Sequence, residues 1–146
     1  MAFFEGNKMT AGYGDGPDII TSCSLSVNRG EIVAILGPNG AGKSTAMKSL
    51  LGLLKLKSGY VKMNDEDISK LSPQDRVRKG ISFVPQTKNV FAELTVQENL
   101  EIGAFLREDD IQSVISEIYE LFPILSEKKS QIVGELSGGQ RQQVAL

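Results

Sequence analysis

The sequence of 146 residues predicts an α/β fold, and three observations support this prediction. The apolar run Ile32–Leu36 is typical of a buried parallel strand, and a glycine-rich loop follows it. A helix is then predicted from Lys43 to Leu54, with an inner face formed by Met47, Leu50, Leu51 and Leu54. Residues 3–11 and 19–28 read as two strands around a turn, which indicates an antiparallel pair. From Leu94 onward, capped segments with apolar residues at helical spacing predict a lobe of helices.

Composition and charge restrict the class of protein. Hydrophobic residues make up 40% and charged residues 23% of the chain, as in an ordinary globular domain. The formal net charge of −2 argues against a nucleic-acid partner bound by phosphate neutralisation. The single cysteine and the lack of histidine exclude an intrachain disulfide and a Ser–His or Cys–His catalytic pair. No apolar run approaches the ~18 residues that cross a bilayer, and the N-terminus lacks a signal-peptide pattern, so we expect a cytoplasmic protein.

The loop after the first predicted parallel strand is the clearest functional motif. It reads Gly37-Pro38-Asn39-Gly40-Ala41-Gly42-Lys43-Ser44-Thr45, which is the G-x-x-x-x-G-K-[ST] phosphate-binding loop (Walker A) of nucleotide triphosphatases. Glycines let backbone N–H groups converge on phosphate oxygens, and the helix N-terminus adds about half a positive charge. We expect Lys43 to reach the β- and γ-phosphates and the Ser44 hydroxyl to be a Mg²⁺ ligand.

The middle of the chain predicts further elements of the same fold. We expect a short strand at residues 60–63, a helix at residues 72–79 and a strand at residues 81–84 that Pro85 closes. Gln86 follows at the carboxyl end of that strand, where ligands of open α/β sheets gather. Its position makes Gln86 a candidate site residue.

The helical lobe begins with a capping box formed by Thr95 and Glu98, whose helix is predicted to end near Arg107. A second helix is predicted after Asp110, and Pro123 is expected to end it. Near the C-terminus, Ser137, Gly138, Gly139 and Gln140 open a further helix and form a second candidate anion site. Tyr13 permits two interpretations, an aromatic side chain packed over a turn or a platform on which an adenine stacks.

Together these motifs resemble the nucleotide-binding subunit of an ATP-binding cassette (ABC) transporter. The pentapeptide Leu136-Ser137-Gly138-Gly139-Gln140 matches the signature motif of that family, and the similarity spans essentially the whole chain. Tyr13 falls at the adenine-stacking position and Gln86 at the glutamine loop. The resemblance implies a P-loop NTPase (RecA-like) core with an antiparallel β-subdomain in residues 1–86, a helical subdomain in residues 87–136 and the signature in residues 137–146.

The resemblance also implies ligands, partners and roles. ATP and Mg²⁺ would lie between the phosphate loop of one subunit and the signature of a second nucleotide-binding subunit, in a homodimer or heterodimer. Ser137 and Gly139 would then contact a γ-phosphate held by the partner chain. Gln86 would reach Mg²⁺ and the attacking water while its loop contacts permease subunits at the inner face of the membrane. Catalysis would consist of positioning and electrostatic stabilisation.

A finer similarity, to subunits of branched-chain amino-acid importers, runs through residues 80–86, 90–100, 103–107 and 120–123. In that subgroup an acidic residue often takes the place of Gln140. Two alternatives remain open, a family member that acts without a membrane permease and a nucleotide-binding module that does not hydrolyse ATP. The family's aspartate for Mg²⁺, its general-base glutamate and its switch histidine belong to later strands. We therefore expect this chain to be the N-terminal portion of a longer subunit, ending before the Walker B strand, and inactive alone.

Overall fold

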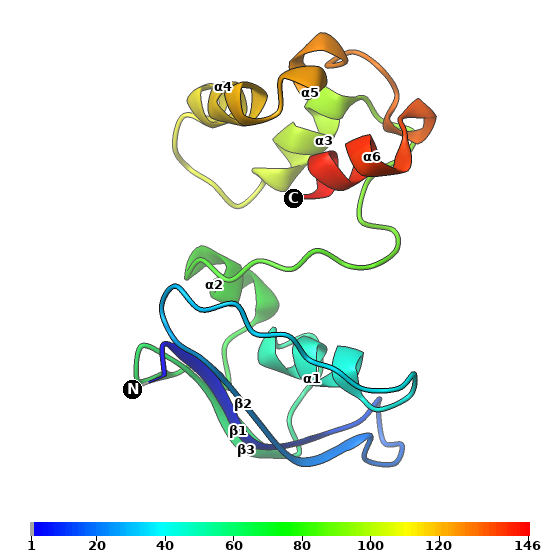
Figure 1. Ribbon diagram of the computed structural model, residues 1–146. Coiled ribbons are helices and arrows are strands. Elements are labelled where there is room, and N and C mark those ends of the chain that lie inside the picture. Colours follow the sequence, from blue (N-terminus) through cyan, green and yellow to red (C-terminus); the bar gives the residue numbers. More distant parts are fainter. Residues whose placement is uncertain (1) are drawn as a thin grey trace. The chain divides into compact units, whose positions relative to one another are not determined.

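The computed structural model describes residues 2–146, which fall into two compact units (Figure 1). The first unit ends at Ser82 and contains a small sheet and two helices. The second unit, Phe83–Leu146, is helical. The phosphate loop and Tyr13 belong to the first unit, whereas Gln86 and the signature belong to the second.

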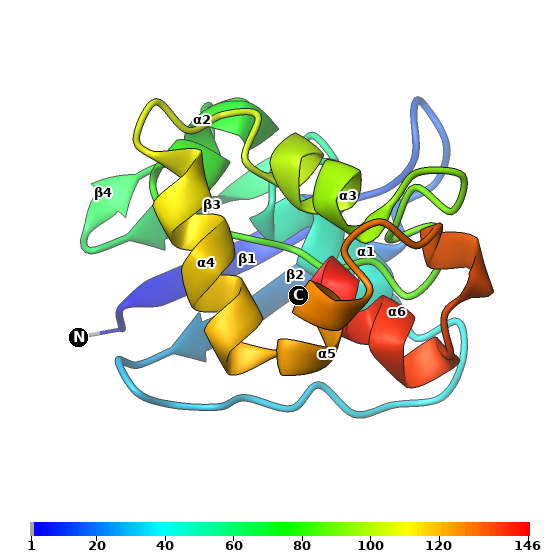
Figure 2. The ribbon, with the colours of Figure 1, turned by 90° about the horizontal axis from the view of Figure 1, so that it is seen from above.

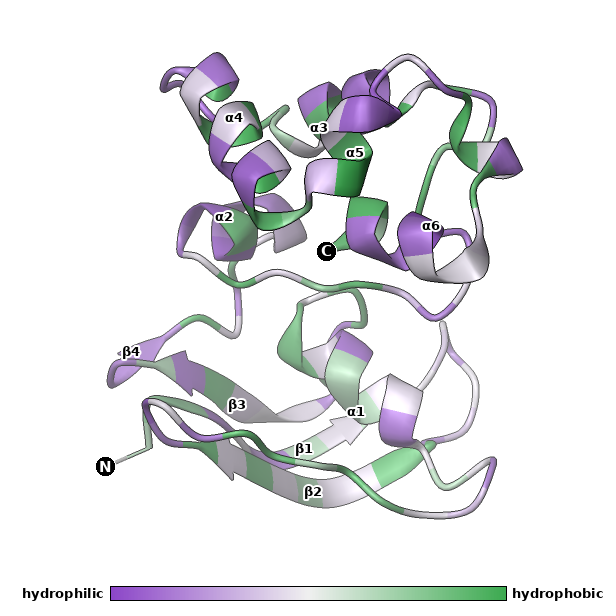
Figure 3. Cartoon of the chain, turned by 45° about the horizontal axis from the view of Figure 1, so that its top comes forward, coloured by the Kyte–Doolittle hydropathy of each residue, from purple (hydrophilic) through white to green (hydrophobic). Residues whose placement is uncertain are grey.

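The sheet of the first unit has four strands in the order β2-β1-β3-β4, and every neighbouring pair is antiparallel. The strands are β1 (Phe4–Ala11), β2 (Ile20–Val27), β3 (Ser58–Met63) and β4 (Glu66–Asp67). Hydrophobic and hydrophilic residues alternate along β2, so that one face of the strand is apolar (Figure 3). The predicted antiparallel pair at the start of the chain is therefore confirmed, and the predicted strand at residues 60–63 begins two residues earlier.

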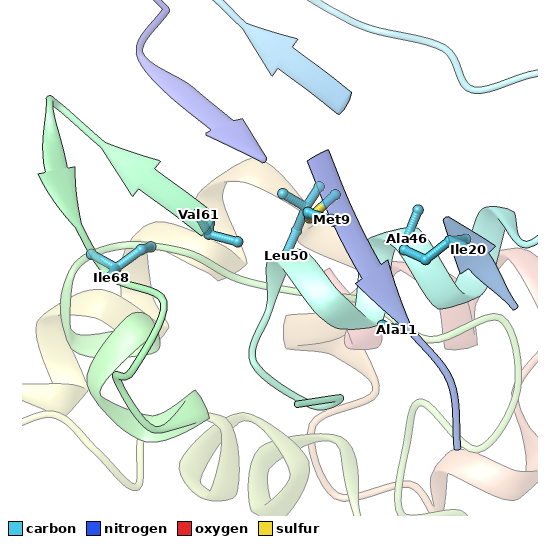
Figure 4. Packing of buried hydrophobic residues seen from close by; sticks show 7 residues of the cluster. All are labelled: Met9, Ala11, Ile20, Ala46, Leu50, Val61 and Ile68. Atoms are coloured by element: carbon cyan, nitrogen blue, oxygen red, sulfur yellow. The ribbon is translucent and has the colours of Figure 1, made fainter. Parts of the chain in front are cut away.

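Helix α1 (Lys43–Leu50) covers the apolar face of this sheet, and α2 (Pro73–Arg78) follows β4. Leu50 of α1 packs beside Met9 of β1 and Ala46 beside Ile20 of β2 (Figure 4). The complete buried cluster comprises Met9, Ala11, Ile20, Ala46, Leu50, Val61 and Ile68. This core joins the strands to the helix that begins at the phosphate loop. The loop therefore has a rigid support on its C-terminal side.

Two predicted strands are not formed. Residues 32–36 run as an extended segment without strand pairing (Figure 2), and residues 81–84 also lack a strand. Ile32 is 98% and Leu36 89% exposed, although an apolar run was expected to be buried. A parallel strand needs hydrogen-bonding neighbours in its sheet, and no segment of residues 2–146 pairs with either run. The apolar composition was recognised correctly, but the burial that it predicts depends on a partner.

The second unit consists of four α-helices and a 3₁₀ turn. They are α3 (Val96–Gly103), α4 (Ile111–Leu121), α5 (Pro123–Glu127), η1 (Val133–Glu135) and α6 (Gly138–Ala145). Its core is formed by Val96, Leu125, Val133, Leu136 and Val144. The helical lobe was predicted, but Pro123 both ends α4 and opens α5, since proline fits the first turn of a helix. In the part of the chain that the structure describes, no helix has the length and apolar character required to cross a membrane.

The ends of three helices differ from the prediction. The helix after the phosphate loop was expected to run to Leu54, but α1 stops at Leu50 and Gly52 follows with a φ of +72°. Met47, expected on its inner face, is 37% exposed. The helix from Thr95 was expected to reach Arg107, but α3 stops at Gly103, a residue of low helix propensity. The helix predicted to reach residue 79 ends one residue earlier, at Arg78.

Candidate functional site

The glycine-rich loop makes a tight turn immediately before α1. The N–H of Ala41 donates to the carbonyl of Pro38 at 3.2 Å, and Gly42 adopts a left-handed conformation with a φ of +84°. A Cβ atom at Gly42 would lie 2.8 Å from the Cγ2 atom of Ile20, which is closer than van der Waals contact allows. Only glycine therefore fits this position, where the loop passes over β2 into the helix.

The Lys43 side chain folds back over this loop. Its ammonium donates to the carbonyl oxygens of Gly37 and Pro38, both at 2.7 Å. The Lys43 ammonium and the backbone N–H groups of the loop together make a positively charged site that can bind an anion. The two carbonyl contacts position the ammonium within the loop, as a phosphate-binding lysine requires.

The first turn of α1 differs from those of α2, α3, α4 and α6, whose N-cap side chains accept backbone hydrogen bonds. Gly42 is the N-cap of α1 and supplies no such side chain. Within residues 2–146, no acceptor takes the N–H groups of Lys43, Ser44 or Thr45. Unpaired donors at a helix N-terminus carry partial positive charge and attract anions. A phosphate group is the ligand that suits this helix start.

The remaining residues of the predicted loop occupy two environments. Asn39, Gly40 and Ser44 are exposed, so the Ser44 hydroxyl is available to a metal-bound triphosphate. Thr45 is 4% exposed, and its carbonyl accepts a hydrogen bond from the Ser49 hydroxyl at 2.8 Å. The two adjacent hydroxyl residues therefore have different roles, one facing solvent and one facing the core.

Tyr13 lies in the loop between β1 and β2 and is 48% exposed. Lys57 anchors this loop by donating to the carbonyl of Gly16 at 2.8 Å and by pairing with Asp18 at 2.7 Å. The N–H of Gly16 also donates to the carbonyl of Tyr13 at 3.1 Å. The loop is thus tied to the sheet at its base while the tyrosine ring remains partly open to solvent, as a stacking platform must be.

Lys48 of α1 contacts Tyr13 in two ways. Its ammonium lies 3.4 Å from the Tyr13 hydroxyl and 5.4 Å from the centre of the ring. Hydrogen bonding from Lys48, followed by that of the Thr45 hydroxyl, lowers the pKa of Tyr13 from its ordinary value. Tyr13 is therefore connected to the helix that starts at the phosphate loop.

In the second unit, Gln86 is exposed at an open depression of about 980 Å³. The depression is lined by residues 86–94 and by Gly138, Arg141 and Gln142. Asn89 donates to the side chain of Gln142 at 3.2 Å, which links the two walls. Gln86 therefore shares one surface hollow with the first turns of α6.

Asn99 holds one wall of this depression in place, and sequence reasoning did not single it out. Its side chain accepts from the N–H of Phe91 at 2.8 Å and donates to the carbonyls of Phe91 and Thr95 at 3.0 and 2.9 Å. Asn99 is only 8% exposed, so these bonds are shielded from water. The signal in the sequence was a polar residue one position after the capping-box glutamate, on the inner face of α3.

Replacing Asn99 by alanine should loosen this wall, because the N–H of Phe91 would lose its acceptor, while the Phe91 carbonyl would keep only the N–H of Leu94. We expect a cost of about 2 kcal/mol and faster hydrogen exchange at the Phe91 amide by tenfold or more. The matched control is Gln97→Ala, which removes only a surface bond to Glu101 on the same helix. Equal exchange rates at Phe91 in both variants would contradict this role.

The signature residues form the N-terminus of α6. Ser137 is the N-cap, and its hydroxyl accepts from the N–H of Gln140 at 3.3 Å. The Gln140 side chain in turn accepts from the N–H of Ser137 at 3.2 Å, which completes a capping box. Gly138 and Gly139 are exposed, and within residues 2–146 nothing accepts their N–H groups. A glutamine at position 140 thus has a structural role that an acidic residue could share.

The first unit combines an antiparallel sheet and helices with a candidate phosphate site at the start of α1. The second unit is helical and carries the signature residues at the start of α6. A profile of the ABC transporter family matches residues 20–146. The chain belongs to this family, whose ATPases bind ATP.

Two relatives are transport proteins for branched-chain amino acids. The probable branched-chain amino acid transport ATP-binding protein LivF of Archaeoglobus fulgidus is 40% identical over 95% of this chain and 59% of its own length. The high-affinity branched-chain amino acid transport ATP-binding protein BraG of Pseudomonas aeruginosa is 41% identical over 84% of this chain and 53% of its own length. The lipopolysaccharide export system ATP-binding protein LptB of Escherichia coli is 32% identical over 100% of this chain and 61% of its own length.

Solved structures agree with these relatives. A nucleotide-free ATP-binding cassette from an ABC transporter matches with a TM-score of 0.84 and 31% identity, over 99% of this chain and 63% of that one. An ADP conformation of such a cassette matches with a TM-score of 0.78 and 32% identity, over the same shares of the two chains. The chain thus spans roughly three fifths of the proteins that it resembles. The α/β fold with a β-subdomain and a helical subdomain is confirmed.

Proposed function

We propose that the chain is the ATP-binding part of an ABC importer subunit, in which ATP binding and hydrolysis drive the uptake of branched-chain amino acids. The observation that carries nucleotide binding is the helix start at Gly42, where three unpaired N–H groups and the Lys43 ammonium converge on one turn. The similarity to LivF and BraG, at 40% and 41% identity, supports the choice of solute.

In this proposal, different residues of the loop bind different parts of the Mg²⁺–triphosphate group. The unpaired N–H groups of Lys43, Ser44 and Thr45 bind the phosphate oxygens, and the Lys43 ammonium moves from the loop carbonyls to the β- and γ-phosphates. Ser44 offers its exposed hydroxyl to Mg²⁺. Bound Mg²⁺ would neutralise charge that develops on the transferred phosphoryl group. Tyr13 stacks on the adenine from the β1–β2 loop.

The catalytic cycle needs a second subunit. Ser137 and Gly139 would bind the γ-phosphate held by a partner's phosphate loop, in a head-to-tail homodimer or heterodimer. The exposed N–H groups of Gly138 and Gly139 support this role, because a helix start favours an anion. Gln86 would reach Mg²⁺ and the attacking water, and its loop would contact the permease at the inner face of the membrane. By itself this chain should bind ATP but hydrolyse it far more slowly than a complete pair.

Binding of MgATP to the chain tests the first part of the proposal. Equilibrium dialysis with labelled ATP should detect binding that excess unlabelled ATP displaces. Lys43→Met should weaken it at least a hundredfold, because the charge-assisted bonds to two phosphates are lost. Lys55→Met serves as the control, since Lys55 is an exposed lysine outside the site. Equal affinities in the Lys43 variant and the unchanged chain would exclude this site.

The transported solute is tested in the organism that encodes the chain. Deletion of its gene should lower the uptake of labelled leucine, isoleucine and valine at low external concentration. A second candidate is lipopolysaccharide export, since LptB of Haemophilus influenzae is 38% identical over 88% of this chain. Normal amino-acid uptake together with lipopolysaccharide lost from the cell surface would favour the export system.

A further inference from the structure

Lys48 is the charged residue that connects the tyrosine loop to the helix of the phosphate site. It lies one turn and a half beyond Lys43 on α1, on a helix whose inner face is fixed by Ala46 and Leu50 in the core. The side chain is partly buried, so its stem is held against the unit while the ammonium reaches Tyr13. The position of the ammonium is therefore set by the helix and not by the loop.

Tyr13 receives two restraints from this one group. The hydrogen bond at 3.4 Å fixes the hydroxyl end of the ring, and the cation at 5.4 Å from the ring centre attracts its face. The other contacts of the loop, at the carbonyl of Gly16 and in the Asp18–Lys57 ion pair, hold its base and do not involve the Tyr13 side chain. Tyr13 is 48% exposed, and the groups that hold its hydroxyl are the Lys48 ammonium first and the Thr45 hydroxyl second.

We propose that Lys48 is a positioning residue for nucleotide recognition: it holds the Tyr13 ring in the orientation in which a planar base stacks, at a fixed place relative to the phosphate loop. This inference rests on the proposed function, because it requires that the loop from Gly37 binds the triphosphate of a nucleotide. Lys48 would therefore contribute to the affinity for the nucleotide base and not to the affinity for the phosphates.

The experiment compares two ligands that share the phosphates but not the base. Lys48→Met should weaken MgATP binding about five- to tenfold and leave the binding of magnesium tripolyphosphate within twofold of that of the unchanged chain. Lys48→Arg should recover most of the MgATP affinity, since a guanidinium can also donate to the hydroxyl and lie over the ring. Lys55→Met, which changes the net charge equally, should alter neither affinity.

Coupling between the two residues gives a second readout. In a double-mutant cycle, adding Lys48→Met to Tyr13→Ala should cause no further loss of MgATP affinity, because the group that Lys48 positions is already absent. A spectroscopic titration of the tyrosines should show the Tyr13 phenolate forming at lower pH in the unchanged chain than in Lys48→Met, with Tyr13→Phe used to assign the transition.

The possible results separate the inference from the function beneath it. If the unchanged chain binds neither MgATP nor tripolyphosphate, the proposed function fails and the role of Lys48 fails with it. If the chain binds both ligands and Lys48→Met changes neither affinity, only the role of Lys48 is overturned. Equal losses for MgATP and tripolyphosphate would also overturn it, since Lys48 would then act on the phosphates.

Discussion

Replacing Arg76 by methionine should lower the free energy of unfolding by about 3 kcal/mol or more. The Arg76 side chain is 2% exposed and lies among backbone carbonyls. It donates to the carbonyls of Ser49 at 3.3 Å, Leu50, Ser69 at 2.9 Å and Leu71 at 3.3 Å. Two of these carbonyls end α1, where a cation also interacts favourably with the helix dipole. Methionine fills similar space but removes the donor from the carbonyls of Leu50, Ser69 and Leu71, while the Ser49 carbonyl still accepts from the N–H of Gly52 at 3.1 Å.

The matched control is Arg78→Met, two residues further along the same chain segment. Arg78 is exposed and forms a surface ion pair with Asp75 at 2.9 Å, so its loss should change stability by less than 1 kcal/mol. Urea unfolding of the whole chain, with hydrogen exchange at the amides of β1, measures the difference. Similar unfolding midpoints for the two variants would show that the buried guanidinium does not support α1.

Replacing Gly59 by alanine should be comparably disruptive. Gly59 has a φ of +85°, and a Cβ atom there would lie 2.4 Å from the carbonyl oxygen of Lys8 and 2.5 Å from that of Asn7. These are atoms of the neighbouring strand, so relief requires β1 and β3 to separate. We expect a loss of about 3 kcal/mol or more, with weaker protection of the β1 amides.

Gly80→Ala provides the control for the backbone conformation alone. Gly80 has a φ of +91°, but a Cβ atom there would meet nothing within 4 Å. This variant should cost only the 1–2 kcal/mol or so of a left-handed residue other than glycine. Thermal unfolding of both variants therefore isolates the steric contact. If the two unfolding midpoints coincide, the steric contact at Gly59 does not contribute to the loss of stability.

Much of the architecture follows from local sequence patterns. The antiparallel pair, the helix after the glycine loop, the capping box at Thr95 and the helix start at Ser137 were predictable because each depends on residues near one another in the chain. The limits of helices were less predictable, since they depend on tertiary contacts. The missing pairing at residues 32–36 was not predictable from the run itself, because burial is a property of neighbours.

In the candidate site, too, the residues in local motifs were predictable and those that act through tertiary contacts were not. The phosphate loop, Gln86 and the signature were recognised from sequence motifs or from their place in the predicted sheet. Lys48, Arg76 and Asn99 were not found. Lys48 and Arg76 act on residues 35 and 26–27 positions away, which no local pattern reveals. Asn99 acts on a loop eight residues earlier, and its role depends on being enclosed by the lobe.

The unpaired run at residues 32–36 has a thermodynamic consequence for the loop that it precedes. The phosphate loop is anchored to the core at Gly42 but enters from a segment without sheet hydrogen bonds, so binding a ligand must include the entropic cost of ordering its entry side. A strand that pairs with Ile32–Leu36 would order this segment before the ligand binds and would so remove the entropic cost from binding. Linkage is reciprocal, so strand pairing would tighten nucleotide binding by the same factor by which the nucleotide favours pairing. A measurement of strand pairing at residues 32–36 with and without nucleotide therefore also gives the effect of that pairing on nucleotide affinity.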